Sequence, residues 1–316
     1  MEQFIELIEE TIYKSTIKDL KRYLRRLAGC TKWLICSDYC LEDKKKSNDV
    51  AVFTVLPYYD YIDNIQKDIS EKAPTDIKKS RLIRESFINY HKSGLIFHFG
   101  FIFGKRGKHI FKDLSREHIL SLLKRTINFV EVLKKNNVPI SADDLQEFTN
   151  KIKALIREAE RKTFSLKLMK KIILINLLAA YIAHLLCRET DVKLVGWFSD
   201  RDDIINAYDE IAFDLFYMNF NALCERSKID VDSNVRLMIA KPSTNENEKM
   251  WYDELNRLPD FIAGTLADWD IAKNHVSKDK FLTMIEGCIA DSNNIAILKL
   301  YAEWVWTCSR VGVNKL

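Results

Sequence analysis

The pattern of hydrophobic and polar positions divides the 316-residue chain into helical and extended segments. Apolar residues at three-to-four spacing across residues 2–28 predict one or two N-terminal helices. After this the period shortens, and alternating or continuous apolar runs indicate strands. The five predicted strands are 31–41, 50–62, 93–105, 192–199 and 235–242. The polar stretch 63–92 is predicted to be helical or irregular.

Most of the remaining chain has the apolar spacing of helices. The predicted helices are 113–137, two within 142–189, 202–226, one across 250–274 that is interrupted at Pro259, 279–291 and 294–309. The second helix within 142–189 is apolar on nearly all sides, which predicts that it is buried between other elements.

The order of these elements indicates a fold class. Three sequential strands, a helix, and then alternating strands and helices give the connectivity of the ribonuclease-H-like fold, in which crossovers join an antiparallel meander to parallel strands. We therefore expect an α/β protein with a mixed five-stranded sheet in the order β-β-β-α-β-α-β-α, a helical insertion, and added N- and C-terminal helices. The expected parts are N-terminal helices (1–30), a ribonuclease-H-like domain (31–141 and 190–274), the helical insertion (142–189) and C-terminal helices (275–316).

The composition is typical of a soluble globular protein, with 47% hydrophobic and 30% charged residues, and it excludes a largely disordered chain. The net charge of +4 is too small to indicate nucleic-acid binding by itself. Basic residues gather in 14–32 and 151–171, where solvated faces of amphipathic helices are the simpler explanation.

The cysteines and the apolar segments suggest a cellular location. The seven cysteines form no Cys-x-x-Cys pair, and we expect reduced thiols. The first residues are acidic and amphipathic, unlike a secretory signal, and the apolar run 172–186 is shorter than a membrane span. These features predict a cytoplasmic protein with no membrane contact. His98, within a predicted strand, and His184, within that apolar run, are interpreted as structural.

Asp38 interrupts the first predicted strand, whose other residues are mostly apolar. Strands are depleted in Asp, and burying an unpaired carboxylate costs several kcal/mol, so Asp38 requires a metal, an arginine or water as a partner. The alternative is that Asp38 begins the turn after the strand. We prefer the first interpretation because Tyr39, Cys40 and Leu41 continue the strand-like pattern.

Two further acidic positions follow from the expected fold. Asp200 ends the fourth strand, at the carboxyl edge where open α/β sheets place ligands, whereas Asp202 and Asp203 suit the capping of the next helix. Pro259 suits the first position of a helix, which would put Asp260 in its first turn. We expect a face of small residues to bring this helix close to the sheet and aim Asp260 at Asp38 and Asp200. That face consists of Ala263, Gly264 and Ala267. Asp268 and Asp270 are interpreted as solvated.

Two short stretches carry a resemblance to known proteins, namely Ser37-Asp38-Tyr39 and the six residues Pro259 to Gly264. Together with the element order, they resemble the ribonuclease-H-like nucleases over roughly residues 31–270. Within that superfamily they are similar to an uncharacterised bacterial family with an Asp-Glu-Ser motif on its first strand and an Ala-Asp-Leu-Val-Ala-Gly-like motif on its last conserved helix. The family's Glu is Tyr39 here, so a fourth ligand must come from elsewhere. Ribonuclease H itself would suggest Glu117, although Glu is also common in a first helical turn as a capping residue.

The resemblance implies a metal-dependent nuclease, a hydrolase that cleaves phosphodiester bonds with two Mg²⁺ or Mn²⁺ ions, in a mobile-element or anti-phage defence system. Asp38 would bridge the ions, Asp200 would hold one and Asp260 the other, with Asp202 in reserve. DNA or RNA would be the partner, and a basic turn after the third strand is the expected contact. That turn contains Lys105, Arg106, Lys108 and His109. The alternative is a non-catalytic module of the same fold that binds a protein or nucleic acid, and the terminal helices could support a homodimer or a protein partner.

Overall fold

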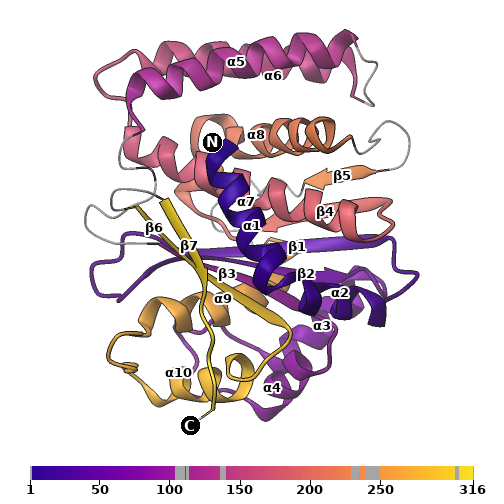
Figure 1. Cartoon of the computed structure of the whole chain (residues 1–316), viewed down its shortest axis with the longest axis vertical. Helices are drawn as coiled ribbons and strands as arrows, with labels where there is room; N and C mark the ends of the chain where they lie inside the picture. The colour runs from indigo at the N-terminus through magenta and orange to yellow at the C-terminus, as the bar shows by residue number, and fades with distance from the viewer. Residues whose placement is uncertain are drawn as a thin grey trace. The chain divides into compact units, whose positions relative to one another are not determined.

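The structure is a computed structural model that describes residues 2–103, 111, 114–135, 140–228, 235–239, 250–302 and 306–315. Within these residues the chain is an α/β protein with ten α-helices, one short π-helix and a seven-stranded mixed sheet (Figure 1). The strands are β1 (Lys32–Cys40), β2 (Asp49–Pro57), β3 (Phe97–Phe103), β4 (Leu194–Ser199), β5 (Arg236–Ile239), β6 (Ile295–Ala302) and β7 (Trp306–Arg310). The helices are α1 (Glu2–Ser15), α2 (Ile17–Arg26), α3 (Ile62–Lys72), α4 (Glu85–Lys92), α5 (Arg116–Lys135), α6 (Ala142–Ala159), α7 (Leu166–Glu189), α8 (Asp203–Ser227), α9 (Asp253–Asp268), α10 (Asp279–Met284) and the π-helix η1 (Ile285–Ile289).

The sheet order is β5-β4-β1-β2-β3-β6-β7, so the first and fourth strands are neighbours, as expected. Strands β1, β2 and β3 form the predicted antiparallel meander, with Asp38 opposite Val52 and Val52 opposite Gly100. Strand β1 extends to Cys40, two residues beyond Asp38. This excludes the interpretation that Asp38 begins the turn.

The C-terminal prediction is wrong in one part. Residues 294–309 do not form a helix: β6 pairs in parallel with β3, and β7 returns antiparallel to β6. The sheet therefore has seven strands and not five. The sequence IAILKLYA is a short apolar run whose period fits either a strand or a buried helix, and pairing with the edge of β3 decides the outcome. The N-terminal helices are confirmed as α1 and α2.

The helix that carries Asp260 also differs from the prediction. Helix α9 runs without interruption from Asp253 to Asp268 and has Pro259 inside it. Proline removes one backbone hydrogen bond from a helix interior, but burial of Leu255, Leu258 and Ile262 against neighbouring elements holds the helix together. Asp260 therefore lies in the middle of α9 and not in its first turn.

The chain forms two compact units, and the first comprises Met1–Lys112, Gly196–Asp200 and Ser243–Leu316. In this unit α9 packs across β1, β2 and β3, and α3, α4 and α10 lie on the same side of the sheet (Figure 1). Helix α2 covers the opposite face, where the Tyr23 ring packs against Trp33 and Phe97. The site described below belongs to the face under α9.

The second unit comprises Asp113–Val195 and Arg201–Pro242. Its helices pack in pairs, α5 with α6, α6 with α8 and α7 with α8. Helix α7 is buried along most of its length, as predicted. Among the described residues it is the one helix long and apolar enough to cross a membrane, and most of that apolar window is buried inside the protein. Helix α8 is broken by non-helical backbone from Ala207 to Glu210.

Candidate acidic site

The alternation of side chains along β1 places Asp38 on the α9 face. Its neighbours Ser37 and Tyr39 point the other way and form a polar network with β4. The Trp197 indole N–H donates to Ser37 Oγ at 2.9 Å, and the Tyr39 hydroxyl lies 2.6 Å from Ser37 Oγ and 2.9 Å from Ser199 Oγ. Trp197 and Ser199 therefore lie on the face opposite α9. Because side chains alternate along a strand, the next residue, Asp200, lies on the α9 face with Asp38.

Backbone pairing fixes the end of β4 beside β1. The Asp200 N–H donates to the Ser37 carbonyl at 3.0 Å, which sets Asp200 next to the residue that precedes Asp38. The Asp200 side chain is exposed, whereas that of Asp38 is half-buried. The opening of the site toward water is therefore on the Asp200 side.

The electrostatics of Asp38 show that the structure brings the three predicted carboxylates together. Burial, the charge of Asp260 and the charge of Asp200 raise the pKa of Asp38 well above its ordinary value, in that order of size. A backbone hydrogen bond from Tyr39 and the positive charge of Lys78 oppose this rise. Asp38, Asp200 and Asp260 thus form one acidic cluster, in which the charges of Asp260 and Asp200 disfavour the ionised form of Asp38.

Asp260 is held by the loop between α3 and α4. The Ile77 N–H donates to Asp260 Oδ2 at 2.7 Å, which stabilises the ionised carboxylate. Burial nevertheless raises the pKa of Asp260 to about 6, with contributions from the charges of Asp76 and Asp200, while the Ile77 hydrogen bond and Lys78 lower it. Near neutral pH this carboxylate is ionised, but at an energetic cost.

Gly264, one turn along α9 from Asp260, explains how the loop comes so close. A Cβ at Gly264 would stand 2.6 Å from Ile77 Cγ2, so only glycine admits the Ile77 side chain at this distance. The small side of Gly264 thus admits the α3–α4 loop. Gly100 on β3 allows α9 to lie close to the sheet, because a Cβ there would stand 2.8 Å from Leu266 Cδ1.

The cluster fits a hard divalent cation by the chemistry of its donors. Mg²⁺ and Mn²⁺ prefer carboxylate oxygens. Burial, and then neighbouring carboxylate charges, raise the pKa of Asp38 and Asp260, and a bound cation would offset both effects. In the described part of the chain, no three His, Cys, Asp or Glu side chains already stand where they could hold a metal ion. Binding of an ion would therefore require the carboxylates to move from these positions.

Other predicted ligands have different roles. Asp202 caps α8 by accepting a hydrogen bond from the Ile204 N–H at 3.2 Å, the alternative that its position suggested. Glu117 is exposed in the first turn of α5, in the second unit, and a hydrogen bond with Ser115 lowers its pKa. The capping contacts at the start of α5 are made by His118, whose N–H donates to Ser115 Oγ at 3.3 Å and whose Nδ1 accepts from the Ser115 N–H at 3.2 Å. The expected nucleic-acid contacts Lys105, Arg106, Lys108 and His109 lie outside the described residues.

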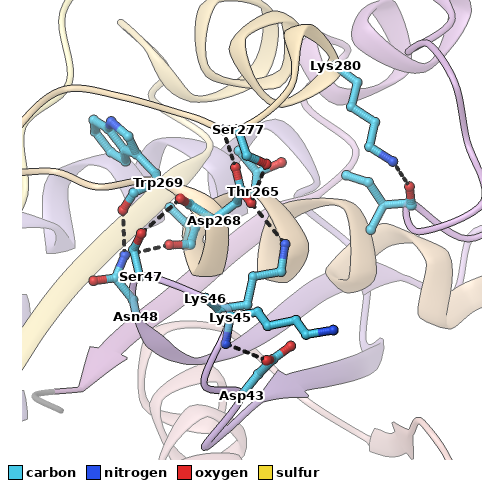
Figure 2. Close-up of polar contacts among 12 residues, drawn as sticks. Asp43, Lys45, Lys46, Ser47, Asn48, Thr265, Asp268, Trp269, Ser277 and Lys280 are labelled. Atoms are coloured by element: carbon cyan, nitrogen blue, oxygen red, sulfur yellow. Dashed lines mark hydrogen bonds and ion pairs between the residues drawn. The ribbon is translucent and has the colours of Figure 1, made fainter. Parts of the chain in front are cut away.

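The solvated interpretation of Asp268 is wrong. Asp268 is buried at the end of α9, where its carboxylate accepts hydrogen bonds from the Ser277 N–H at 2.7 Å and Ser277 Oγ at 2.8 Å, and pairs with Lys46 Nζ at 3.0 Å (Figure 2). Burial raises the pKa of Asp268, but these contacts outweigh burial and leave the pKa below its ordinary value. Ser47 and Asn48 bind backbone carbonyls at the same helix end (Figure 2). Asp268 therefore ties the β1–β2 turn to α9 and is separate from the acidic cluster.

The histidines have structural surroundings. His98 Nδ1 lies 2.7 Å from Thr54 Oγ1, and the His98 ring stacks on His91 with centroids 4.6 Å apart. His184 Nε2 lies 2.8 Å from Ser227 Oγ, which links α7 to α8.

The residues that the sequence did not reveal are Ile77 and Lys78. They lie in the polar stretch PTDIKKS, which has no periodicity and no motif. A single apolar residue between charged ones was the only signal, and it is common in surface loops. Comparisons with protein-family models, with curated proteins and with solved structures found no match to this chain.

Proposed function

We propose that this protein is a ribonuclease-H-like, metal-dependent nuclease whose metal ligands are Asp38, Asp200 and Asp260. The observation that carries the proposal is the acidic cluster itself. Three aspartates that are separated by 162 and 60 positions in the sequence come from the middle of the sheet, the end of β4 and the helix that covers β1, and their charges act on one another.

The strand order supports the fold part of the proposal. The sequence β3-β2-β1-β4-β5 within the sheet is the order expected of the ribonuclease-H-like fold, and β6 and β7 extend it beyond β3. In that fold, carboxylates on the first strand, at the end of the fourth strand and on a later helix meet at one place. Asp38, Asp200 and Asp260 occupy these three places here.

The chemistry follows from the donor set. Two divalent ions would supply an activated water and would relieve charge on the leaving oxygen of a phosphodiester. The protein residues contribute position: the sheet fixes Asp38, the β4–β1 pairing fixes Asp200, and the Ile77 N–H orients Asp260. Mg²⁺ or Mn²⁺ is the proposed cofactor, and DNA or RNA is the proposed substrate.

A second function is favoured by Tyr39. At the place of the family's Glu, the Tyr39 side chain points to the opposite face and bonds to Ser37 and Ser199, so it cannot join the cluster without breaking this network. With one ligand fewer, the same fold could serve as a non-catalytic module that binds nucleic acid or a protein.

A nuclease panel separates these two functions. Single- and double-stranded DNA and RNA are incubated with Mn²⁺ and the wild type, Asp38→Asn or Asp200→Asn. The nuclease proposal expects cleavage of at least one substrate by the wild type, and a loss of about two orders of magnitude or more in each variant. Equal activity in the wild type and both variants would trace the cleavage to a contaminant and reject the proposal.

A further inference from the structure

The loop between α3 and α4 is fastened to the acidic cluster at one residue, Ile77. Its N–H donates to Asp260, its side chain fills the space left by Gly264, and its carbonyl accepts a hydrogen bond from Lys280 Nζ. Lys280 also donates to the Ser80 carbonyl at 2.8 Å, and Arg257 donates to the Ala73 carbonyl at 2.6 Å. The loop backbone is therefore bound to the α9 side at several points.

Lys78 follows Ile77 directly, so the same contacts determine where its side chain begins. The Lys78 side chain is exposed, yet its charge reaches both Asp38 and Asp260 and stabilises their ionised forms. In the part of the chain that the structure describes, Lys78 forms no ion pair within 4.0 Å with either aspartate. The exposed Lys78 ammonium group thus lies near the acidic cluster and forms no ion pair with Asp38 or Asp260.

The neighbouring lysines are engaged elsewhere. Lys46 pairs with Asp268, as Figure 2 shows, Lys280 binds the loop carbonyls, and Lys79 pairs with Asp76 at 3.2 Å. Among these four lysines, Lys78 is the one that is exposed and whose charge stabilises the ionised forms of both Asp38 and Asp260. A polyanion that approaches an acidic site needs such a charge close to that site.

We propose that Lys78 contacts a backbone phosphate of a nucleic-acid strand beside the acidic cluster, and that the Ile77 contacts position it for this role. The inference rests on the proposed function because it names a substrate contact of that same site. It assigns this role to a loop in which the sequence shows no motif.

The test measures binding of a fluorescein-labelled single-stranded oligonucleotide by anisotropy, in Ca²⁺ and over about 50 to 200 mM salt. Four proteins are compared: the wild type, Lys78→Gln, Lys78→Arg and the matched control Lys79→Gln. We expect Lys78→Gln to bind about tenfold more weakly and to lower the slope of log affinity against log salt by about one. Lys78→Arg keeps the charge and should restore binding, and Lys79→Gln should bind as the wild type does.

A parallel Mn²⁺ titration by calorimetry distinguishes the inference from the proposed function. Because Lys78 repels a cation in the cluster, Lys78→Gln should bind Mn²⁺ more tightly, on the order of threefold. If the wild type binds Mn²⁺ and the oligonucleotide, and Lys78→Gln matches it in both, the role of Lys78 is refuted while the proposed function stands. If the wild type binds neither, the proposed function fails and the role of Lys78 fails with it.

Discussion

Replacing Asp260 with Asn should make the metal-free protein more stable, because it removes a charge that is buried and lies near the charges of Asp76 and Asp200, while it keeps the loop attached. The Asn side-chain oxygen can still accept the hydrogen bond from the Ile77 N–H, which Asp260 Oδ2 accepts at 2.7 Å. The charge is what the substitution removes. If Asp260 holds a metal ion as proposed, this gain in stability would be accompanied by a loss of activity.

The magnitude follows from the pKa of Asp260, which is raised from 3.8 to about 6. At about 1.36 kcal/mol for each pKa unit, the folded state is destabilised by up to about 3 kcal/mol when the carboxylate is ionised. The sign is opposite to that of a salt-bridged aspartate: the folded state holds its proton more tightly than the unfolded state, so this cost is absent below pH 4 and complete above pH 6. We expect Asp260→Asn to raise the free energy of unfolding by about 1 to 3 kcal/mol at neutral pH.

The assay is urea unfolding in EDTA at about pH 4 and about pH 7.5, followed by circular dichroism. The difference between Asp260→Asn and the wild type should be small at the lower pH and large at the higher one. Asp63→Asn, at an exposed position on α3, is the control and should change stability by less than about 0.5 kcal/mol at both pH values. A destabilised Asp260→Asn at neutral pH, or a difference that does not vary with pH, would refute the electrostatic reasoning.

Three further predictions address the surroundings of the site. Gly264→Ala places a methyl group 2.6 Å from Ile77 Cγ2 and should lower the free energy of unfolding by about 1 to 3 kcal/mol. The control Gly312→Ala has open space around it and should leave the urea midpoint unchanged. Equal effects of the two substitutions would contradict the close contact at Gly264. Asp268→Ala leaves buried partners unpaired and should cost about 2 to 4 kcal/mol in the same assay, so a loss below about 0.5 kcal/mol would show that Asp268 is solvated after all. Burial lowers the pKa of His91 to about 4. As the pH falls below 6.5, His91 is protonated in the unfolded state while it stays neutral in the folded state, so the free energy of unfolding should drop by about 3 kcal/mol toward pH 4. His91→Phe should remove that part of the pH dependence, and an unchanged pH profile of unfolding would count against a buried neutral imidazole.

The three clustered aspartates could be found from the sequence because each lies within or directly after a mostly apolar segment, where a carboxylate is unusual. Asp38 interrupts an apolar strand, Asp200 ends one, and Asp260 lies among small and apolar residues. Such positions can be recognised from the sequence because the residue types around them alone make a carboxylate unusual. Their proximity was then inferred from the order of the elements, which places β1 beside β4.

Other features depend on contacts between segments that are distant in the sequence. Asp268 resembles a solvated residue at a helix end until Lys46, 222 positions earlier, is seen beside it. The run 295–302 becomes a strand because β3 offers an open edge to it, and its own period does not decide between strand and helix. The contacts of Ile77, and with them the position of Lys78, are seen only when the loop packs against Gly264 and Asp260.

The most direct measurement of the central claim is calorimetric titration of the intact protein and Asp38→Asn with Mn²⁺. The intact protein should take up Mn²⁺, and Asp38→Asn should lose that uptake because it removes the central carboxylate of the cluster. Uptake by the intact protein that does not exceed the level of Asp38→Asn would contradict a metal site formed by Asp38, Asp200 and Asp260.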